Sequence, residues 1–415
     1  MAVPANILQQ VQTYQLSALA FMQNLNCFVS TANTRFKEFE QLVGNLGDTV
    51  TFDLPPRMTT TASLVANFQP ANQRVQSLVC EQAASASYAF TSQQFIFNVE
   101  EYMERFGKAA VKEIGAQVEA NVALNCVTNT YRFFGDGVNP INSYTQLANA
   151  LALFRNYGSA SMNLKGYLQD TAIPNIIGTG QNQFTLDRNN ETANSWELGK
   201  FSNCEWYQSN LLPVHIAGTE GQNNSLLTVS AITQNAAGEI TAITFTGTLN
   251  ANDPNSVLQY DKFQFQDGVA GQPNVRYLTF VGHKTSANHV QFAATANAGS
   301  NGANTVTVQI TPFLQAAPVY NQNINNQIQV GMQVRVLPSH RAGMITAGDP
   351  LFLAMPRLPD QAPFYTGNEI DEDTGVSIRM YYGATFGKNQ MGMVHDCIWG
   401  STLVPEDAMA VIFPL

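Results

Sequence analysis

The longest regular pattern in the sequence is helical and runs from Asn98 to Thr128. Apolar residues recur there at spacings of three or four, as on one face of an α-helix. Asn98 can cap the first turn, and glutamates follow near the positive N-terminal end of the helix. A helix of about 30 residues spans about 45 Å, which is longer than ordinary globular helices. The expected apolar face consists of Val99, Met103, Phe106, Ala110, Ile114, Val118, Val122 and Leu124.

The segment before this helix has the pattern of a long β-hairpin with little apolar content. Valine and phenylalanine alternate with threonine in the range 47–56, which opens on Gly-Asp and ends on two prolines. A second strand pattern, rich in alanine and serine, covers 75–88. Two-stranded ribbons are only marginally stable in water, so we expect this hairpin to lie on another surface.

The range 222–315 predicts a small antiparallel barrel. Short runs of Thr, Val, Ile and Phe recur there between turn signals, as in small all-β domains. Mixed helix and strand patterns flank this range, and the chain ends in an apolar strand pattern at 408–413. The expected barrel strands are Leu226–Ile232, Ile240–Gly247, Phe263–Phe265, Arg276–Val281, His289–Phe292 and Thr305–Thr311.

Aromatic residues of the barrel segment allow two interpretations. They can stack on nucleic-acid bases, as in single-strand binders, or fill the barrel interior. The basic partners there are only Lys262, Arg276 and Lys284, and this favours the interior. The aromatic residues are Phe263, Phe265, Tyr277, Phe280 and Phe292.

A shorter helical pattern covers 143–160. Ser143 stands in the capping position, and Leu147, Leu151 and Phe154 fall on one face. We expect this face to pack on the rest of the chain.

Charged residues make up only 12% of the chain, and the formal net charge is −10, whereas about a quarter of residues are charged in an average protein. A subunit whose surface is covered by neighbours can be poor in charge, because charged residues are depleted at interface cores. Tight nucleic-acid binding depends on clustered Lys and Arg, which this acidic chain lacks.

No Lys or Arg precedes Arg35 and no long apolar run occurs, so we expect neither a secretion signal nor a membrane span.

The sequence contains no common catalytic or metal-binding motif. Five scattered cysteines form no C-x-x-C pair, and no G-x-S-x-G, P-loop or H-E-x-x-H pattern occurs. His395-Asp396-Cys397 has the composition of a Cys/His site, and alternate residues of a strand share a face, but packing is the favoured interpretation. We therefore expect no catalytic, cofactor-binding or metal-binding residues, and a protein that is not an enzyme.

Seven stretches carry a resemblance to a known family when they are taken in order. They are GDTVTFDLPP (47–56), FIFNVEEYMERFGKAAVKEIGAQVEANVALN (95–125), LLPVHIAGT (211–219), YDKFQFQDGV (260–269), NTVTVQITP (304–312), AGDPLFLAMPRLP (347–359) and IWGSTLVPEDAMAVIFP (398–414). The chain resembles the major capsid (coat) proteins of tailed bacteriophages with the Hong Kong 97-type fold. Within that group it is similar to the coats of short-tailed phages related to the Salmonella podovirus, which carry an inserted β-barrel domain.

The resemblance implies an α+β fold with an extended hairpin, a long spine helix, and peripheral and axial domains. Its parts would be an N-terminal arm at 1–46, the extended loop hairpin at 47–97, the spine helix at 98–130, the axial domain at 131–221 and 316–346, the inserted small antiparallel β-barrel at 222–315, and a returning peripheral-domain sheet at 347–415.

The same resemblance implies self-assembly into an icosahedral phage head, through a procapsid that expands on DNA packaging. The implied partners are further copies of the chain in hexamers and pentamers, a scaffolding protein and a portal protein. Packaged double-stranded DNA would lie inside without specific binding, and no membrane would be involved. The implied location is the virion shell, after assembly in the host bacterial cytoplasm.

Some relatives lock the shell by an isopeptide bond between a lysine of the extended loop and an asparagine. Here no lysine occurs between Lys37 and Lys108, so we expect a shell without covalent cross-links. Arg57 and Arg74 flank the hairpin tip, and we expect them to pair with carboxylates of a neighbouring subunit. The alternative is that both are solvated surface residues.

Gly107 and Gly115 weaken the long helix locally. We expect them to act as hinges when the domains rotate during expansion.

Two other functions remain open from the sequence. A phage tail or decoration protein would share the polar, β-rich composition but would not need the long helix. A β-rich carbohydrate-active enzyme would need paired carboxylates in a cleft, and the acidic residues of the sequence single out no such pair.

Overall fold

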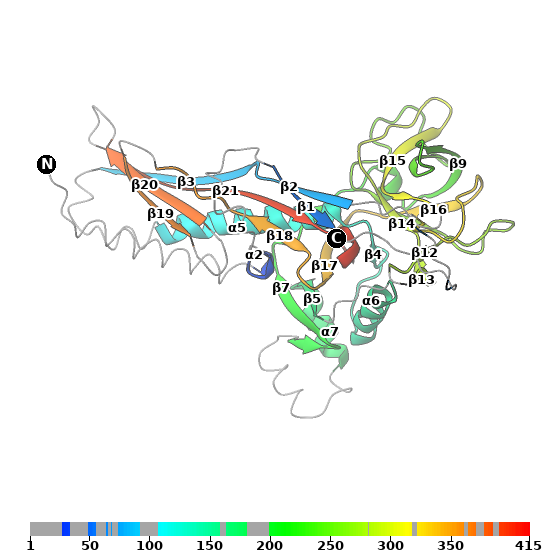
Figure 1. Ribbon diagram of the computed structural model, residues 1–415, viewed down its shortest axis with the longest axis horizontal. Helices are drawn as coiled ribbons and strands as arrows, with labels where there is room; N and C mark the ends of the chain where they lie inside the picture. Colours follow the sequence, from blue (N-terminus) through cyan, green and yellow to red (C-terminus); the bar gives the residue numbers. More distant parts are fainter. Residues whose placement is uncertain are drawn as a thin grey trace. The chain divides into compact units, whose positions relative to one another are not determined.

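In the computed structural model of Figure 1 the chain forms two compact units. Unit 1 comprises Met1–Phe52, Val75–Cys126 and Asp349–Leu403, and unit 2 comprises Asp53–Arg74, Val127–Gly348 and Val404–Leu415. The structure describes residues 27–33, 49–54, 64, 68, 74–91, 107–157, 163–180, 199–280, 282–317, 322–360, 364–370, 377–384 and 390–415.

The main sheet of unit 1 is antiparallel and contains five strands. They are β3 (Gln82–Thr91), β18 (Leu351–Ala354), β19 (Tyr365–Ile370), β20 (Ser377–Ala384) and β21 (Gln390–Leu403). Strands β3 and β20 both pair with the N-terminal part of β21, while β18 pairs with its C-terminal end and β19 pairs with β20. The long strand β21 therefore holds the sheet together.

One face of β21 packs on helix α5 (Lys108–Asn129). Trp399 Nε1 donates a hydrogen bond to Asn121 Oδ1 at 3.3 Å, and Asn125 Nδ2 donates to the Ser401 carbonyl oxygen at 2.6 Å. Because side chains alternate between the two faces of a strand, every second residue of β21 from Met393 to Trp399 is buried. The buried residues of this face are Met393, His395, Cys397 and Trp399.

Helix α5 is the described part of the helix expected at 98–130, and residues 98–106 lie outside the described ranges. Its buried residues recur at spacings of three and four, as expected for one helix face. The prediction for Leu124 was wrong, since this residue is 46% exposed. Two residues turn a helix by about 200°, so Leu124 points away from Val122. The buried apolar face contains Val111, Ile114, Val118 and Val122.

Glu119 is a buried acid within the apolar face of α5, at 1% exposure. Its carboxylate accepts the backbone N–H groups of Phe28 at 2.8 Å and Val29 at 3.1 Å, in the short helix α2 (Cys27–Thr31). The first N–H groups of a helix lack partners within the helix, and a negative charge is favourable there. Glu119 thus holds the described part of the expected N-terminal arm against α5.

The hairpin expected at 47–97 contributes to two different sheets. Strands β1 (Thr49–Leu54) and β2 (Arg74–Val79) pair with each other. Strand β2 ends before Cys80 and Glu81, which belong to no strand. The next strand, β3, pairs with β21 instead of with β1. The sequence pattern does not show this break, because the alternation of buried residues continues from Leu78 through Cys80 to Ala84.

Unit 2 contains a seven-stranded sheet in the order β4-β22-β17-β5-β7-β6, with β8 paired to β17. Its strands are β4 (Phe133–Phe134), β5 (Leu164–Gln169), β6 (Lys200–Phe201), β7 (Cys204–Ser209), β8 (Val214–His215), β17 (His340–Ala347) and β22 (Ala408–Pro414). The expected buried C-terminal strand is confirmed as β22, which runs antiparallel to β17 and parallel to β4.

The expectation of one returning sheet over 347–415 needs correction. Strands β18 to β21 form the sheet of unit 1, whereas β22 joins the sheet of unit 2 after a short 3₁₀ helix, η4 (Pro405–Asp407). Apolar strand patterns of this kind predict burial but do not specify the partner strand.

Helices α6 (Tyr144–Asn156) and α7 (Ala172–Gly180) share a hydrophobic core with this sheet. Helix α6 confirms the helix expected at 143–160. Ser143 Oγ accepts the backbone N–H of Gln146 at 3.3 Å, and Gln146 Oε1 accepts that of Asn142 at 2.7 Å, so side chains satisfy donors at the helix start. The predicted apolar face is fully buried at Leu147, Leu151 and Phe154.

Six strands of unit 2 close into the expected barrel, in the order β10-β15-β14-β11-β16-β9. They are β9 (Leu226–Gln234), β10 (Ile240–Thr246), β11 (Lys262–Phe265), β14 (Gln291–Ala294), β15 (Thr305–Leu314) and β16 (Gln333–Val336). Strands β12 (Arg276–Leu278) and β13 (Thr285–His289) form a hairpin outside the barrel. The short helix α9 (Thr219–Gln222) precedes the first barrel strand.

The aromatic residues of this segment fill the barrel core, which confirms the favoured interpretation. The rings of Phe263 and Phe292 stack with centroids 4.9 Å apart, and Phe245 lies 5.8 Å from Phe263. All three are fully buried, while Phe280 packs at the edge of the cluster.

The expected barrel segment, 222–315, is too short. Strand β16 closes the barrel by pairing with β11 and β9, and it lies in the range assigned above to the axial domain. The chain leaves the seven-stranded sheet at β8 and returns to it at β17, where His215 pairs with His340. All six barrel strands lie between these two neighbouring positions.

Within the described ranges, none of the helices is both long and apolar enough to cross a lipid bilayer.

The Glu119 contact gives a stability prediction for the full chain. Glu119→Ala leaves two buried N–H groups of α2 without their acceptor, which costs about 1–3 kcal/mol. Glu119→Gln retains one acceptor oxygen and should lose less. Urea unfolding followed by tryptophan fluorescence measures both changes. Glu113→Gln, at an exposed position of the same helix, is the control. An unchanged unfolding midpoint for Glu119→Ala would contradict this account of the contact.

Candidate functional site

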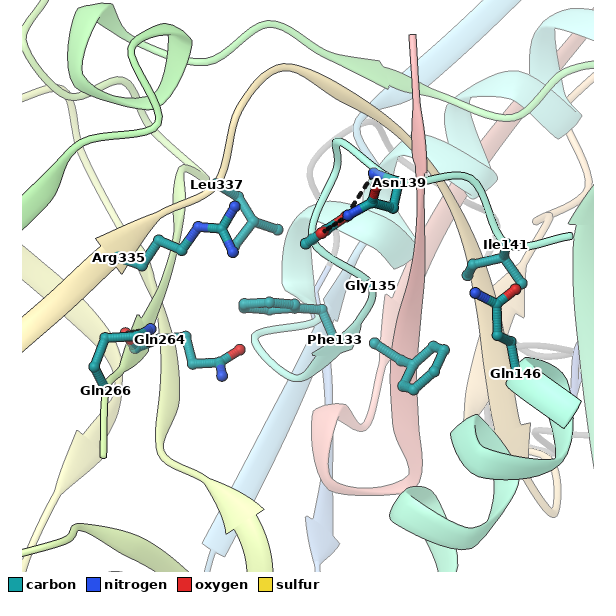
Figure 2. Close-up of a pocket in the computed structure, with 11 residues that line it drawn as sticks. Phe133, Gly135, Asn139, Ile141, Gln146, Gln264, Gln266, Arg335 and Leu337 are labelled. Atoms are coloured by element: carbon teal, nitrogen blue, oxygen red, sulfur yellow. Dashed lines mark hydrogen bonds between the residues drawn. The ribbon is translucent and has the colours of Figure 1, made fainter. Parts of the chain in front are cut away.

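A cavity of about 410 Å³ lies in unit 2 where the barrel meets the loop after β4. In Figure 2, Arg335 of β16 and Gln264 of β11 extend from the barrel side, and Phe133 and Asn139 lie across from them. Amide side chains and one guanidinium therefore face an aromatic ring and a polar loop.

The loop after β4 requires glycine at two positions. Gly135 and Gly137 have φ values of +110° and +71°, which side chains rarely allow. A Cβ at Gly135 would lie 2.7 Å from the Ile412 carbonyl oxygen. Between them, Asp136 accepts the backbone N–H groups of Val138 at 3.0 Å and Asn139 at 2.8 Å. These contacts give the cavity wall one defined conformation.

Asp136 is ionised in this turn. Partial burial by itself would raise the pKa of the carboxyl group, but the hydrogen bonds from Asn139 and Val138, together with the nearby Arg335, hold it below its usual value.

The barrel is joined to the sheet by a glutamine that bonds to backbone. Gln291 of β14 donates from Nε2 to the Phe133 carbonyl oxygen at 2.9 Å, and its Oε1 accepts the Phe133 N–H at 2.8 Å. Strand β4 thus pairs with β22 through its backbone and with a barrel side chain through Phe133. Asn288 Nδ2 adds a bond to the Leu153 carbonyl oxygen of α6 at 3.0 Å.

A buried lysine makes a second connection. Lys262 of β11 is 2% exposed, and its Nζ donates to the carbonyl oxygens of Val127, at 3.2 Å, and Thr130. Carbonyl groups in the last turn of a helix lack partners within the helix and favour a cation. Burial lowers the pKa of the Lys262 ammonium to about 7, because a charged group is costly in a low-dielectric interior.

An aspartate holds the segment through which the chain enters the barrel. Asp261 is fully buried and accepts the backbone N–H groups of Gly218 at 3.1 Å and Leu258 at 2.8 Å. Its Oδ1 also lies 2.7 Å from His215 Nε2. The His215 and His340 rings are 5.3 Å apart. Burial lowers the pKa of His340 to about 3, against the opposing effect of the Pro338 carbonyl, so His340 is neutral.

The four site residues expected from the sequence do not form a described cluster. Arg57 lies outside the described residues, and Arg74 is the first residue of β2 with its side chain outside them. Gly107 directly precedes α5, and Gly115 lies inside it, both buried. The helix is continuous through Gly115, and the contact and hinge roles stay predictions.

His395 and Cys397 lie on the same buried face of β21, as their spacing predicted. Burial lowers the pKa of His395 to about 4. Burial, with a smaller effect of Asp396, raises the pKa of Cys397 to about 12. A nucleophilic cysteine needs a thiolate, and here the thiol is protonated near neutral pH. Asp396 instead pairs with Arg379 Nε at 2.9 Å, and these side chains serve packing.

No group of three or more His, Cys, Asp or Glu side chains in the described ranges is placed to hold a metal ion.

Sequence reasoning missed the polar side chains that join the barrel to the sheet. Asp261 and Lys262 stand next to each other at the start of an alternating strand, and Gln291 precedes Phe292 in another. An amide or a charge beside aromatic residues was the available signal. Lys262 and Gln291 form hydrogen bonds with residues that lie more than a hundred positions away in the sequence. No local pattern therefore identifies these partners.

The buried lysine predicts a pH dependence of stability. Between pH 7 and about 10 the folded chain holds Lys262 mostly neutral, whereas the unfolded chain binds the proton, so stability rises with pH by at most about 1.4 kcal/mol per unit. Lys262→Met should remove this contribution. Urea unfolding at several pH values compares the slopes, with the exposed Lys284→Met as the control. Equal slopes for wild type and Lys262→Met would show that Lys262 is not the source.

The chain matches no protein-family model and no curated protein. The solved structures with similar arrangements include three from phages. A structure of Mycobacterium phage Che8 is 8% identical over 93% of this chain and 90% of that chain, with a TM-score of 0.45. The capsid of Ralstonia phage GP4 is 7% identical over 94% and 88%, with a TM-score of 0.43. The capsid structure of the Cyanophage P-SCSP1u is 10% identical over 92% and 88%, with a TM-score of 0.41.

Proposed function

We propose that this chain is the major capsid protein of a tailed bacteriophage, with a Hong Kong 97-type fold and an inserted barrel. The observation that carries the proposal is the order of its elements. A β1–β2 pair, the helix α5, a mixed sheet with its helices, a closed barrel and the returning strands β18 to β21 follow one another along the chain. This is the order that the seven sequence stretches imply.

The insertion of the barrel supports the Salmonella podovirus-like branch. The two sheet positions that flank the barrel, His215 and His340, are register partners. A segment whose ends lie side by side can be added to an existing sheet without moving its strands, because the sheet continues across the insertion point. The barrel is also connected to the sheet by Gln291 and Lys262.

Exposed apolar residues between β1 and β2 support an assembly role for the hairpin. Leu64 and Phe68 are 108% and 94% exposed. Large apolar side chains gain free energy when a partner covers them, and aromatic residues are enriched at interfaces. Only 12% of the chain is charged, which fits a subunit with several covered surfaces. A neighbouring subunit is the proposed partner of this tip.

The complete proposal has the chain assemble in the host bacterial cytoplasm into hexamers and pentamers of a procapsid, with a scaffolding protein and a portal protein. The shell expands as double-stranded DNA is packaged, and the chain ends in the virion. The contacts are non-covalent, because the extended loop has no lysine between Lys37 and Lys108.

Expression of the full chain, alone and with a candidate scaffolding protein, tests this function. Negative-stain electron microscopy should show closed shells of uniform size, and a denaturing gel of the same particles should show one band at the monomer mass. A ladder of linked subunits would contradict the non-covalent shell. A monomer that never assembles, even with scaffold, would favour the tail or decoration alternative.

The same assay tests the four residues. Arg57→Ala with Arg74→Ala should reduce the yield of shells, because paired carboxylates of the neighbour lose their partners. Lys200→Ala, at an exposed position, is the control.

Gly107→Ala with Gly115→Ala should stiffen the helix, since Ala is favoured over Gly by about 1 kcal/mol per position. This double variant should therefore slow heat-induced expansion of the shell. Normal assembly in the first variant or normal expansion in the second would refute the respective role.

A further inference from the structure

Asn301 begins an exposed turn that leads into barrel strand β15. Its side-chain Oδ1 accepts the backbone N–H groups of Ala303 and Thr305, each at 3.0 Å. Its backbone N–H donates to the Thr305 carbonyl oxygen at 2.9 Å, and its carbonyl oxygen accepts the N–H of Asn304 at 3.1 Å. The next residue is Gly302, and this is the only Asn-Gly pair in the sequence. The turn therefore places an asparagine amide beside a residue without a Cβ.

An asparagine amide can react with the backbone nitrogen that follows it, with water as the only co-reactant. The Gly302 nitrogen, after losing its proton to hydroxide, forms a bond to Asn301 Cγ. The bond between Cγ and Nδ2 then breaks, and Nδ2 takes up a proton and leaves as ammonia. The product of this step is a succinimide ring.

Water opens the succinimide in one of two directions. Breaking the bond between Cγ and the Gly302 nitrogen gives aspartate. Breaking the bond between that nitrogen and the main-chain carbonyl carbon of Asn301 gives isoaspartate, whose main chain is longer by the side-chain CH₂ group. In both cases an amide and water become a carboxylate and ammonium, and nothing is oxidised or reduced.

The turn keeps the two reacting atoms near each other. The hydrogen bond from Ala303 to Asn301 Oδ1 closes a small ring that contains both Asn301 Cγ and the Gly302 nitrogen. A rotation about the Cα–C bond of Asn301 brings these atoms into contact. Residues 301–304 are all exposed, and exposed loops open locally at low cost. A glycine leaves the most freedom for this rotation, because it has no side chain.

The turn between β9 and β10 has the same hydrogen bonds. Asn235 Oδ1 accepts the backbone N–H groups of Ala237 and Glu239, each at 3.0 Å. The Asn235 N–H donates to the Glu239 carbonyl oxygen at 3.0 Å. The fourth residue of each turn has a positive φ, +81° at Gly238 and +55° at Asn304. Asn235 is also exposed, so the two turns form a matched pair within one chain.

Two features separate Asn301 from Asn235. The residue after Asn235 is Ala236, whose side chain hinders the approach of its nitrogen to Cγ. Asn235 Nδ2 donates to Glu239 Oε2 at 2.7 Å, and this bond has to break before Nδ2 leaves. Within the described ranges, Asn301 Nδ2 makes no such bond. Both features favour the reaction at Asn301.

The folded turn is compatible with the aspartate product. A carboxylate oxygen can accept the same two N–H groups, from Ala303 and Thr305, and hydrogen bonds to an ionised acceptor are stronger than those to a neutral one. The product also adds a negative charge to the surface of the barrel.

We propose that Asn301 is a site of spontaneous deamidation in the folded chain, whereas Asn235 keeps its amide. The reaction gives a population of chains with one added negative charge, and this population grows as the protein ages. The inference is independent of the capsid function and rests on these two turns of the barrel.

Incubation of the folded full chain in mildly alkaline water that carries a heavy oxygen isotope tests the site. The water that opens the succinimide leaves its label in the carboxylate, so the reaction is distinguished from deamidation during sample handling. Peptide mass spectrometry should show labelled acid at position 301 that increases with time, and an intact amide at Asn235. An intact Asn301 amide, after a time in which the chain denatured in guanidinium chloride is converted, would overturn the proposal.

Gly302→Ala tests the role of the following residue. Gly302 does not have a left-handed φ, and a Cβ there would come no closer than 3.6 Å to a residue beyond its chain neighbours, so the turn should be kept. Conversion at Asn301 should fall to the level of Asn235. Urea unfolding checks that the variant is folded. Equal conversion in wild type and in this variant would contradict the proposal.

The reverse exchange tests the same idea in the other turn. Ala236→Gly with Glu239→Thr gives the Asn235 turn the residue types that follow Asn301 at the corresponding positions. Conversion at Asn235 should rise to the level of Asn301 in the same chain, which serves as the internal reference. No gain at Asn235 would show that these two features do not determine the site.

Discussion

The bonding of barrel side chains to the backbone of the neighbouring sheet and helices is the interaction on which the rest of unit 2 depends. Gln291 occupies both the N–H and the carbonyl of Phe133, and Lys262 occupies carbonyls at the end of α5. These side chains are buried, and a buried polar group without a partner costs about 1–3 kcal/mol. Displacing the barrel would break several such bonds together, so the barrel and the sheet are held in one arrangement.

This constraint explains why the barrel can be inserted without loosening the sheet. The chain leaves at His215 and returns at His340, and these residues remain paired. Asp261 holds Gly218 and Leu258 near the entry, so the connecting segment has its own polar support. If the shell expands as proposed, the movement has to occur where such bonds are absent or can be exchanged. The helix around Gly107 and Gly115 is the proposed place.

The sequence predicted elements whose information is local. The α6 cap at Ser143, the buried C-terminal strand and the aromatic barrel core follow from residue spacing and are confirmed. The sheet assignments were wrong where a strand pairs with a strand that is distant in the sequence. Strand β16 closes the barrel although it follows β15 after a long connection, and β22 leaves the sheet of β21. A periodic pattern specifies which face is buried but not which strand lies beside it.

The candidate site was less accessible to sequence reasoning than the fold. Lys262, Arg132 and Glu119 are charged residues that solvent normally surrounds, and no pattern marks them as buried. Each is paired with backbone groups of a segment far away in the chain, and tertiary structure alone reveals that pairing. The site residues predicted from the sequence were two arginines, a residue type that is usually exposed, and two glycines, a type that is conformationally flexible. The structure instead identifies buried polar residues.

The most direct measurement of the central claim is a cryo-electron microscopy map of particles formed by the full chain, at a resolution that shows side chains. The account predicts a closed icosahedral shell in which Leu64 and Phe68 contact a neighbouring subunit. It also predicts that Gln291 remains bonded to Phe133 in every subunit. Particles without icosahedral symmetry, or a shell in which that tip faces solvent, would contradict it.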